Sequence, residues 1–254
     1  MKRLPRRLSY GEEATLVEHL EELRSRLIIC LLALGAAFPI AFYFHEHLID
    51  ALVRLAPDDK EIVTLGVAEP FTTALKVSFY ASLALAFPVI VWQAWSFFAP
   101  AVREGNQRIV ARFVALATLL FAGGMAFAYF VILPRALDFL TNYDEELYRI
   151  DIRASYFLSF VALMIFATGL VFQLPIFVLA LVRLGVLTSA QLRRNRRMGI
   201  VILLGAAILL PTVDPVSLAL EVIPLLVLFE LSIWLSVLLE RRWRSAEAVI
   251  IDNA

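Results

Sequence analysis

Long apolar segments recur along the whole chain. Five are free of charged residues, and a sixth is interrupted only by Glu230. They cover residues 27–44, 77–102, 113–134, 154–182, 198–213 and 222–239. A membrane-spanning helix needs about 20 mostly apolar residues, with a range of about 17–25. The pattern therefore predicts an all-α integral membrane protein with six transmembrane helices.

The spans differ in length. The fifth runs for thirteen residues before Pro211 ends it, which gives roughly 20 Å of helix against a hydrocarbon core of about 30 Å. Prolines lie inside or near four of the other spans, and proline bends or breaks a helix because it removes a backbone donor. These prolines are Pro39, Pro88, Pro175 and Pro224. We therefore expect a kinked, concave bundle in which spans five and six are short.

Composition supports a membrane environment. The chain has 254 residues, of which 61% are hydrophobic and only 18% are charged. A soluble domain usually has about 45–50% apolar and about 25% charged residues, so this excess of apolar surface favours lipid as the solvent. The net charge of zero gives no reason to expect nucleic acid as a partner. Cys30 is the single cysteine, so no intramolecular disulfide is expected, and nothing in the sequence indicates a cofactor or a metal site.

The basic residues predict the orientation. If the N-terminus is inside, the inner segments hold 17 of the 23 lysines and arginines and the outer segments hold six. Basic residues concentrate on the cytoplasmic side of membrane proteins. We therefore expect a single membrane domain over 1–254, with a cytoplasmic amphipathic N-terminus at 1–26, six helices at 27–239 and a cytoplasmic tail at 240–254. The outer connection at 45–72 is expected to form a cap with a helical piece at 45–55 and a turn at Glu69-Pro70.

The segment just before the first span is amphipathic. An apolar stripe at helical spacing is formed by Leu16, Leu20, Leu23 and Leu27. Glu18 and Glu22 lie on the opposite face, and Glu22 can pair with Arg26 one turn later. The segment can be a surface anchor with solvated charges. Alternatively, its acidic face binds a cationic peptide, because carboxylates pair well with guanidinium groups.

Few polar residues lie inside the spans. Gln173 is in the fourth span and Glu230 in the sixth. A charged side chain at the centre of a membrane helix costs about 2.5–3.5 kcal/mol, so Glu230 is expected to be protonated, paired or facing a wet cavity. Asp214 and Glu221 are nearer the outer turn and can simply be solvated.

Several motifs, in order, resemble the TatC family, the polytopic subunit of the twin-arginine protein translocase. They are HLEELRSRL at 19–27, Glu69-Pro70-Phe71 followed by Lys76, FP at 87–88, QAWSF at 93–97 with Pro100, GMAFAYF at 124–130, SY at 155–156 and FQLP at 172–175. Asp214 and Glu230 also fall at the positions expected for this family. The resemblance covers residues 15–240.

This resemblance implies a receptor and scaffold rather than an enzyme. TatC proteins bind the paired arginines of a signal peptide on the cytoplasmic face and recruit the single-span subunits TatA and TatB. Folded cargo then crosses the inner membrane of a prokaryote at the expense of the proton-motive force. Further copies of the chain and membrane lipid are also expected partners. By carry-over, Glu22 contacts the signal arginines and Arg24 supports the same surface.

The chain departs from the family pattern in the first inner loop. An ungapped comparison from Pro100 places Asn106 where the family usually has glutamate, followed by Gln107 and Arg108, while Glu104 lies two residues earlier. Either Glu104 takes the role through a loop shift, or Asn106 supplies a weaker neutral hydrogen bond. Gln173 stands where glutamate is common and is a candidate contact for a peptide or a partner helix.

Two other functions compete with this interpretation. A proton-coupled secondary transporter could use Glu230 as a relay, but it would need several polar groups near the midplane of the membrane. An intramembrane enzyme is less favoured, because the three histidines lie outside the spans and no HExxH motif occurs.

Overall fold

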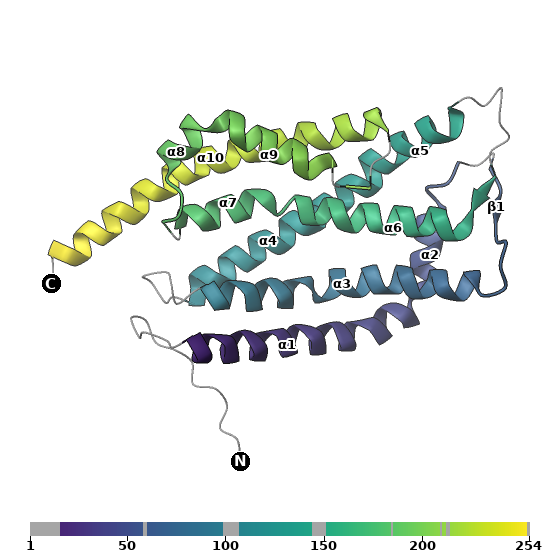
Figure 1. The fold of residues 1–254 in the computed structure, drawn as a ribbon, viewed down its shortest axis with the longest axis horizontal. Helices are drawn as coiled ribbons and strands as arrows, with labels where there is room; N and C mark the ends of the chain where they lie inside the picture. Colours follow the sequence, from purple (N-terminus) through teal and green to yellow (C-terminus); the bar gives the residue numbers. More distant parts are fainter. Residues whose placement is uncertain are drawn as a thin grey trace, which may run out of the picture.

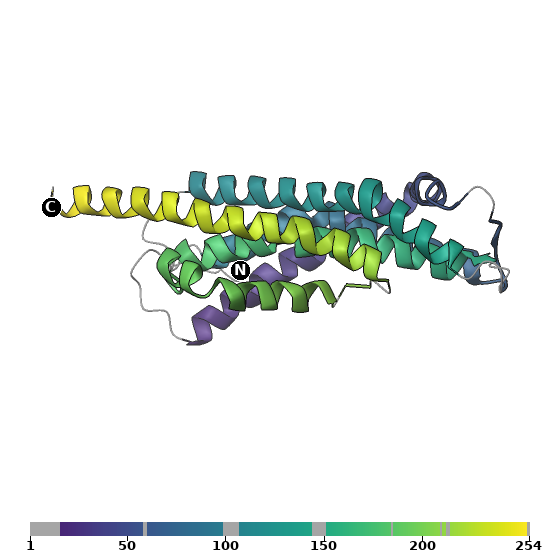
Figure 2. The same ribbon diagram turned by 90° about the horizontal axis from the view of Figure 1, so that it is seen from above.

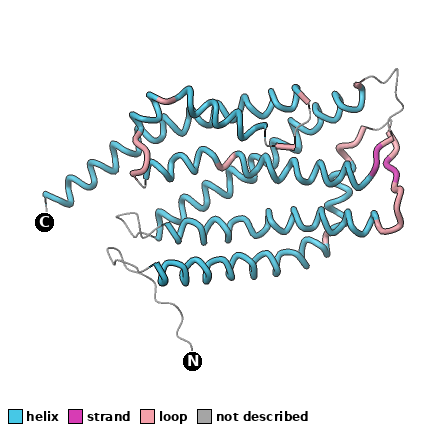
Figure 3. The backbone as a smooth tube through the Cα atoms, in the orientation of Figure 1, coloured by secondary structure: helices cyan, strands magenta, loops and turns pink. Residues whose placement is uncertain are grey.

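The computed structural model describes residues 16–57, 60–98, 107–143, 151–183, 185–208, 210–211 and 214–252. Within these ranges the chain is almost entirely helical, with a single pair of very short strands (Figure 3). In chain order, the elements are α1 (Leu16–Tyr43), α2 (His45–Val53), β1 (Ile62–Val63), α3 (Glu69–Phe98), α4 (Gln107–Phe127), the π-helix η2 (Ala128–Ile132), α5 (Leu133–Asn142), β2 (Ile152–Arg153), α6 (Ala154–Val171), α7 (Leu174–Arg183), α8 (Ser189–Arg194), α9 (Arg196–Ile208) and α10 (Pro215–Asp252).

The helices confirm the predicted fold class. Five segments of the described chain are long and apolar enough to span a membrane: α1, α3, α4 with its continuation through α5, α6 with α7, and the first part of α10. The sixth crossing is α9, which has only 13 residues, as the sequence predicted. Figure 1 shows these segments side by side, with α9 and the beginning of α10 stopping short of the full length of the bundle.

The two ends of the bundle differ. The start of α1, the whole of α8 and the end of α10 lie together at one end, which we call the basic end because α8 and its neighbours carry Arg183, Arg193 and Arg194 (Figure 1). Helix α2 and both strands lie at the opposite end, which we call the cap end. The view from above shows α10 extending beyond the other helices at the basic end (Figure 2).

The cap end departs from two expectations. Strands β1 and β2 pair in parallel, with Ile62 opposite Ile152, a contact that the all-α prediction omitted because two-residue strands leave no periodic pattern. The sequence also suggested a turn at Glu69-Pro70, and this was wrong: Glu69 and Pro70 form the first turn of α3. Proline suits that position, because the first turn of a helix has no internal partner for its backbone donors. The predicted helical piece at 45–55 is confirmed as α2.

Close helix packing holds the middle of the bundle together. Gly124 of α4 faces Gly169 of α6, and a Cβ atom at Gly124 would lie 3.0 Å from the Cα of Gly169. Small residues allow membrane helices to approach closely, since dispersion contacts rather than the hydrophobic effect drive their association. An apolar cluster fills the cap half around η2 and α6, with Ile132, Leu133 and Val161 fully buried.

Of the four prolines expected to bend the spans, one lies next to a break between helices and three lie inside continuous helices. The fourth span is divided into α6 and α7 at Phe172 and Gln173, just ahead of Pro175. Pro39, Pro88 and Pro224 lie inside α1, α3 and α10.

Candidate functional site

The amphipathic segment before the first span is fixed against α3 at the basic end. Arg26 Nε donates to Glu22 Oε1 at 3.1 Å, which confirms the predicted pair, and Arg26 Nη2 bonds the same oxygen. The Arg26 guanidinium also donates to two backbone carbonyls of α3, from Nη2 to Ser96 at 2.9 Å and from Nη1 to Gln93 at 3.4 Å. The side chains of Glu22 and Arg26 are only 19% and 18% exposed. A carboxylate is therefore held in a defined position at the end of α3.

A ring contact adds to this attachment. The centroid of the His19 imidazole lies 4.5 Å from that of Phe97, near the C-terminus of α3. Arg24 is exposed on α1, and its role in supporting an arginine site stays a prediction. These contacts place the acidic segment beside the point where the chain leaves α3 for the first inner loop.

The loop half of the predicted arginine site cannot be described in the same way. Glu104 and Asn106 lie outside the described residues. Arg108 is in the first turn of α4, and the placement of its side chain is also outside the description. The roles assigned to these three residues stay predictions.

Gln173 bridges two helices at the break between α6 and α7. Its Nε2 donates to the carbonyl of Ala117 on α4 at 3.2 Å and more weakly to the carbonyl of Gly169 at 3.5 Å. The side chain is half-buried, so its carbonyl oxygen can still meet another group. This bond is a structural role for Gln173, and contact with a peptide or partner helix stays a prediction.

Glu230 is paired. Its Oε2 lies 3.4 Å from Nη2 of Arg196, the first residue of α9, and the two side chains are 40% and 43% exposed. Of the three states expected from the sequence, the structure therefore selects an ion pair.

Asp214 and Glu221 were expected to be solvated, and this was wrong. Asp214 is 5% exposed, and its Oδ1 accepts a hydrogen bond from the backbone of Ser217 at 2.7 Å, so it caps the N-terminus of α10. Glu221 is 1% exposed, and its two carboxylate oxygens are buried without a hydrogen-bond partner in the part of the chain that the structure describes. Helix α10 packs directly on the bundle from its first turn, which removes this turn from solvent.

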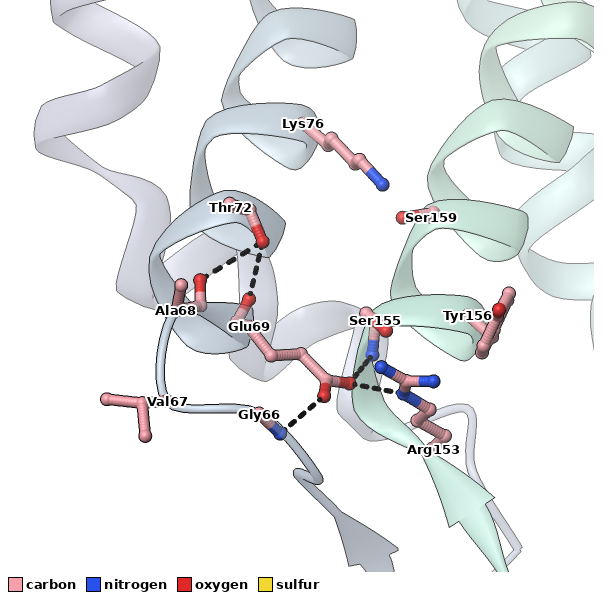
Figure 4. Close-up of a pocket in the computed structure, with 10 residues that line it drawn as sticks. All are labelled: Gly66, Val67, Ala68, Glu69, Thr72, Lys76, Arg153, Ser155, Tyr156 and Ser159. Atoms are coloured by element: carbon pink, nitrogen blue, oxygen red, sulfur yellow. Dashed lines mark hydrogen bonds and ion pairs between the residues drawn. The ribbon is translucent and has the colours of Figure 1, made fainter.

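The outer-loop motif forms a second site at the cap end (Figure 4). Glu69 is 6% exposed and accepts four hydrogen bonds. Its Oε1 binds Arg153 Nε and the backbone of Ser155, both at 3.1 Å. Its Oε2 accepts from the backbone of Leu65 at 3.0 Å and of Gly66 at 3.1 Å. Glu69 therefore ties the loop before α3 to the start of α6.

The other residues of this motif surround the pinned glutamate. Pro70 and Phe71 are exposed at the start of α3, and Lys76 faces a small pocket between α3 and α6. The hydrogen bond from Arg153 to Glu69 raises the pKa of the guanidinium, so Arg153 stays protonated at every physiological pH. Within the part of the chain that the structure describes, no cluster of three or more His, Cys, Asp or Glu side chains could hold a metal ion.

Sequence reasoning missed the partners of the predicted residues. The contacts of Arg26 with α3 and of Glu69 with Arg153 join positions 67 to 84 residues apart. No spacing of residues within one helix predicts these contacts. Arg196 was one of the 17 basic residues assigned to the inner segments, and its pairing with Glu230 on another helix was not predicted.

Comparison with known proteins identifies the family. The family model for the Sec-independent protein translocase protein TatC matches residues 18–224. The TatC protein of Escherichia coli K12 is 35% identical over 233 residues, covering 90% of each chain, and that of Koribacter versatilis is 34% identical, covering 90% of this chain and 87% of the relative.

Solved structures agree with this match. A crystal structure of the twin-arginine translocase receptor TatC in the detergent DDM superposes with a TM-score of 0.76 at 34% identity, covering 86% of this chain and 99% of that one. A second crystal structure of the receptor gives a TM-score of 0.75 at 35% identity, covering 87% of this chain and 98% of the other. The six crossings, the ordered motifs and these matches lead to one conclusion: the chain belongs to the TatC family of Sec-independent protein translocase proteins.

Proposed function

We propose that this protein is the signal-peptide receptor of a twin-arginine translocase and that Glu22 binds the signal arginines. Family membership supports the broader role, a membrane component of Sec-independent protein translocation that works with other Tat subunits. The observation that carries the finer proposal is the position of Glu22. Its carboxylate is held by Arg26, which is itself anchored to the end of α3 beside the first inner loop.

The chemistry of Glu22 suits a guanidinium ligand. Both bonds from Arg26 go to Oε1, so Oε2 can accept from a signal arginine without breaking the internal pair. If the incoming arginine displaces Arg26, the Arg26 side chain keeps its bonds to the α3 carbonyls of Ser96 and Gln93. Lysine is a poorer ligand here, because it lacks the planar fork that matches a carboxylate.

The remaining parts of the proposal extend from this point. The basic end faces the cytoplasm, as the distribution of arginine predicts, in the inner membrane of a prokaryote. Glu104 or Asn106, with Arg108, completes the arginine site. The apolar part of the signal inserts along the bundle past Gln173, and single-span TatA and TatB subunits dock on the membrane faces. The chain acts by binding rather than by catalysis and uses no cofactor.

The transporter alternative rests on Glu230 as a proton relay. Glu230 instead holds Arg196 in an ion pair. No other observation favours small-solute transport.

The test is cross-linking of a twin-arginine signal peptide to the full-length protein in membrane vesicles, with the photoprobe next to the arginine pair. Glu22→Gln should weaken arginine-dependent adducts about tenfold, because a charge-assisted hydrogen bond becomes a neutral one. Glu21→Gln is the matched control, since Glu21 is exposed and adjacent on α1. A twin-lysine peptide should give few adducts with either protein.

Two further variants divide the loop alternatives. Loss of adducts with Glu104→Gln would assign the second contact to Glu104, whereas loss with Asn106→Ala would assign it to Asn106. Equal labelling of wild type and Glu22→Gln would refute the role of Glu22.

A further inference from the structure

The pocket beside the pinned Glu69 has the properties of an anion site. It has a volume of about 550 Å³ and lies between the loop before α3 and the first turns of α3 and α6 (Figure 4). Two cations, Lys76 and Arg153, line it together with Ser159 and Tyr156. One acid lines it, and that acid is Glu69.

The charges in the pocket do not balance. Glu69 already accepts four hydrogen bonds, one of them from Arg153. Lys76 has no ion-pair partner among the residues that the structure describes. The pocket therefore carries one positive charge in excess, and an ammonium group next to apolar helices is costly unless an anion accompanies it.

A second group in the pocket lacks a partner. The hydroxyl oxygen of Ser159 is buried and makes no hydrogen bond in the structure. Figure 4 shows this hydroxyl on α6 directed toward the ammonium group of Lys76 on α3, with the Arg153 guanidinium near the first turn of α6. An anion between Lys76 and Ser159 would accept from both at once, and the Arg153 guanidinium, which lies beside Glu69 about one helix turn away, would add positive charge to the same pocket.

The position of the pocket indicates where that anion comes from. Lys76 lies seven residues into α3, or about 10 Å from its first residue. At this depth a lysine extends its ammonium group toward the membrane surface, where lipid phosphates lie. Tyr156 lines the pocket and is 71% exposed, which suits contact with the glycerol and upper acyl regions of a lipid.

We infer that Lys76, Ser159 and Arg153 form a binding site for a phosphate group, presented by a phospholipid of the leaflet at the cap end. Phosphate fits better than a carboxylate, because its additional oxygens can be shared among several donors. The inference does not depend on signal-peptide binding at the opposite end of the molecule.

Native mass spectrometry of the full-length protein in detergent tests this site. Phosphatidylglycerol is titrated against diacylglycerol with the same acyl chains. Wild type should retain one phosphatidylglycerol per chain and little diacylglycerol. Lys76→Gln should weaken this retention about tenfold, since it removes a hydrogen bond to a charged group.

Two variants separate the site from general effects. Arg54→Gln removes an exposed cation at the end of α2, outside the pocket, and should retain lipid as wild type does. Ser159→Ala keeps every charge and should weaken retention a few-fold. Because Lys76 is exposed and unpaired, Lys76→Gln should melt at the wild-type temperature, and if it does not, Ser159→Ala decides the question.

Three results would overturn the inference. Equal retention of phosphatidylglycerol by wild type, Lys76→Gln and Ser159→Ala would show that the pocket is not the site. Equal retention of diacylglycerol would show that acyl chains rather than phosphate are recognised. Displacement of the lipid by submillimolar inorganic phosphate, in a Lys76-dependent way, would replace the lipid with free phosphate as the ligand.

Discussion

The crossing of α4 and α6 offers a sharp test of the packing, because adjacent glycines on α4 have opposite surroundings. A Cβ atom at Gly124 would lie 2.8 Å from Cγ of Phe172 and 3.0 Å from Cα of Gly169. A Cβ atom at Gly123 would have nothing within 4 Å. We therefore compare Gly124→Ala with Gly123→Ala.

Both substitutions gain the same contribution from helix propensity. Alanine is favoured over glycine in a helix by about 1 kcal/mol, so Gly123→Ala should stabilise the protein slightly or leave it unchanged. Gly124→Ala carries in addition an overpacking cost of about 1–3 kcal/mol, since the backbone of Gly169 cannot turn away as a side chain can. The difference in the free energy of unfolding between the two variants cancels the helix-propensity contribution. What remains is the cost of overpacking where α4 crosses α6.

Thermal unfolding in detergent, followed by intrinsic fluorescence, measures that difference. For a protein of this size, 1 kcal/mol corresponds to about 2–4 °C, so Gly124→Ala should melt about 2–12 °C below Gly123→Ala. Lipid composition and detergent are kept the same for both. Melting temperatures that agree within error would show that α4 and α6 do not approach each other as described.

Three other substitutions test the polar contacts. Glu69→Gln should lower the melting temperature and speed proteolysis of the loop before α3, because the glutamine side chain has no charge and only one acceptor oxygen in place of two. Glu61→Gln replaces an exposed acid nearby and should change neither the melting temperature nor the proteolysis. Asp214→Ala should cost about 1 kcal/mol in the free energy of unfolding through loss of the α10 cap, while Asp214→Asn should retain most of it. Glu230→Gln should lower the free energy of unfolding by about 1 kcal/mol, and adding Arg196→Gln should recover part of that loss. A double-mutant cycle measures this coupling, and strictly additive effects would mean that the ion pair contributes nothing to stability.

Hydropathy predicted the crossings because lipid imposes a uniform requirement on every residue that faces it. The six apolar segments, the short fifth span and the placement of α2 all follow from composition over windows of ten to twenty residues. The first and last residues of the helices could not be predicted from hydropathy. Helix α3 begins at Glu69, eight residues before the apolar run, because a helix that leaves the hydrocarbon continues as long as its polar groups find partners.

Polar contacts between residues close in the sequence were predicted, and those between distant residues were not. The Glu22–Arg26 pair was predicted because both residues lie one turn apart on one helix. The contact between Glu69 and Arg153 joins the starts of two helices, which are brought together by the packing of α3 against α6 and by the paired strands β1 and β2. Burial of Asp214 and Glu221 had the same cause: a turn whose composition indicates solvent is covered by an element far away in the sequence.

The short fifth span and the ion pair at Glu230 explain each other. Helix α9 has 13 residues, whereas the apolar part of its neighbour α10 extends from Pro215 to Leu238, 24 residues. Two antiparallel neighbours of such unequal length cannot both have their ends at the membrane surface, so the basic start of α9 must lie beside apolar turns of α10. Glu230 meets Arg196 at that place. Beyond it, Leu231, Trp234 and Leu238 are exposed on α10 and require cover by lipid. The carboxylate is therefore best understood as the counterion that allows a truncated helix to begin within the apolar layer, where an unpaired arginine would be costly.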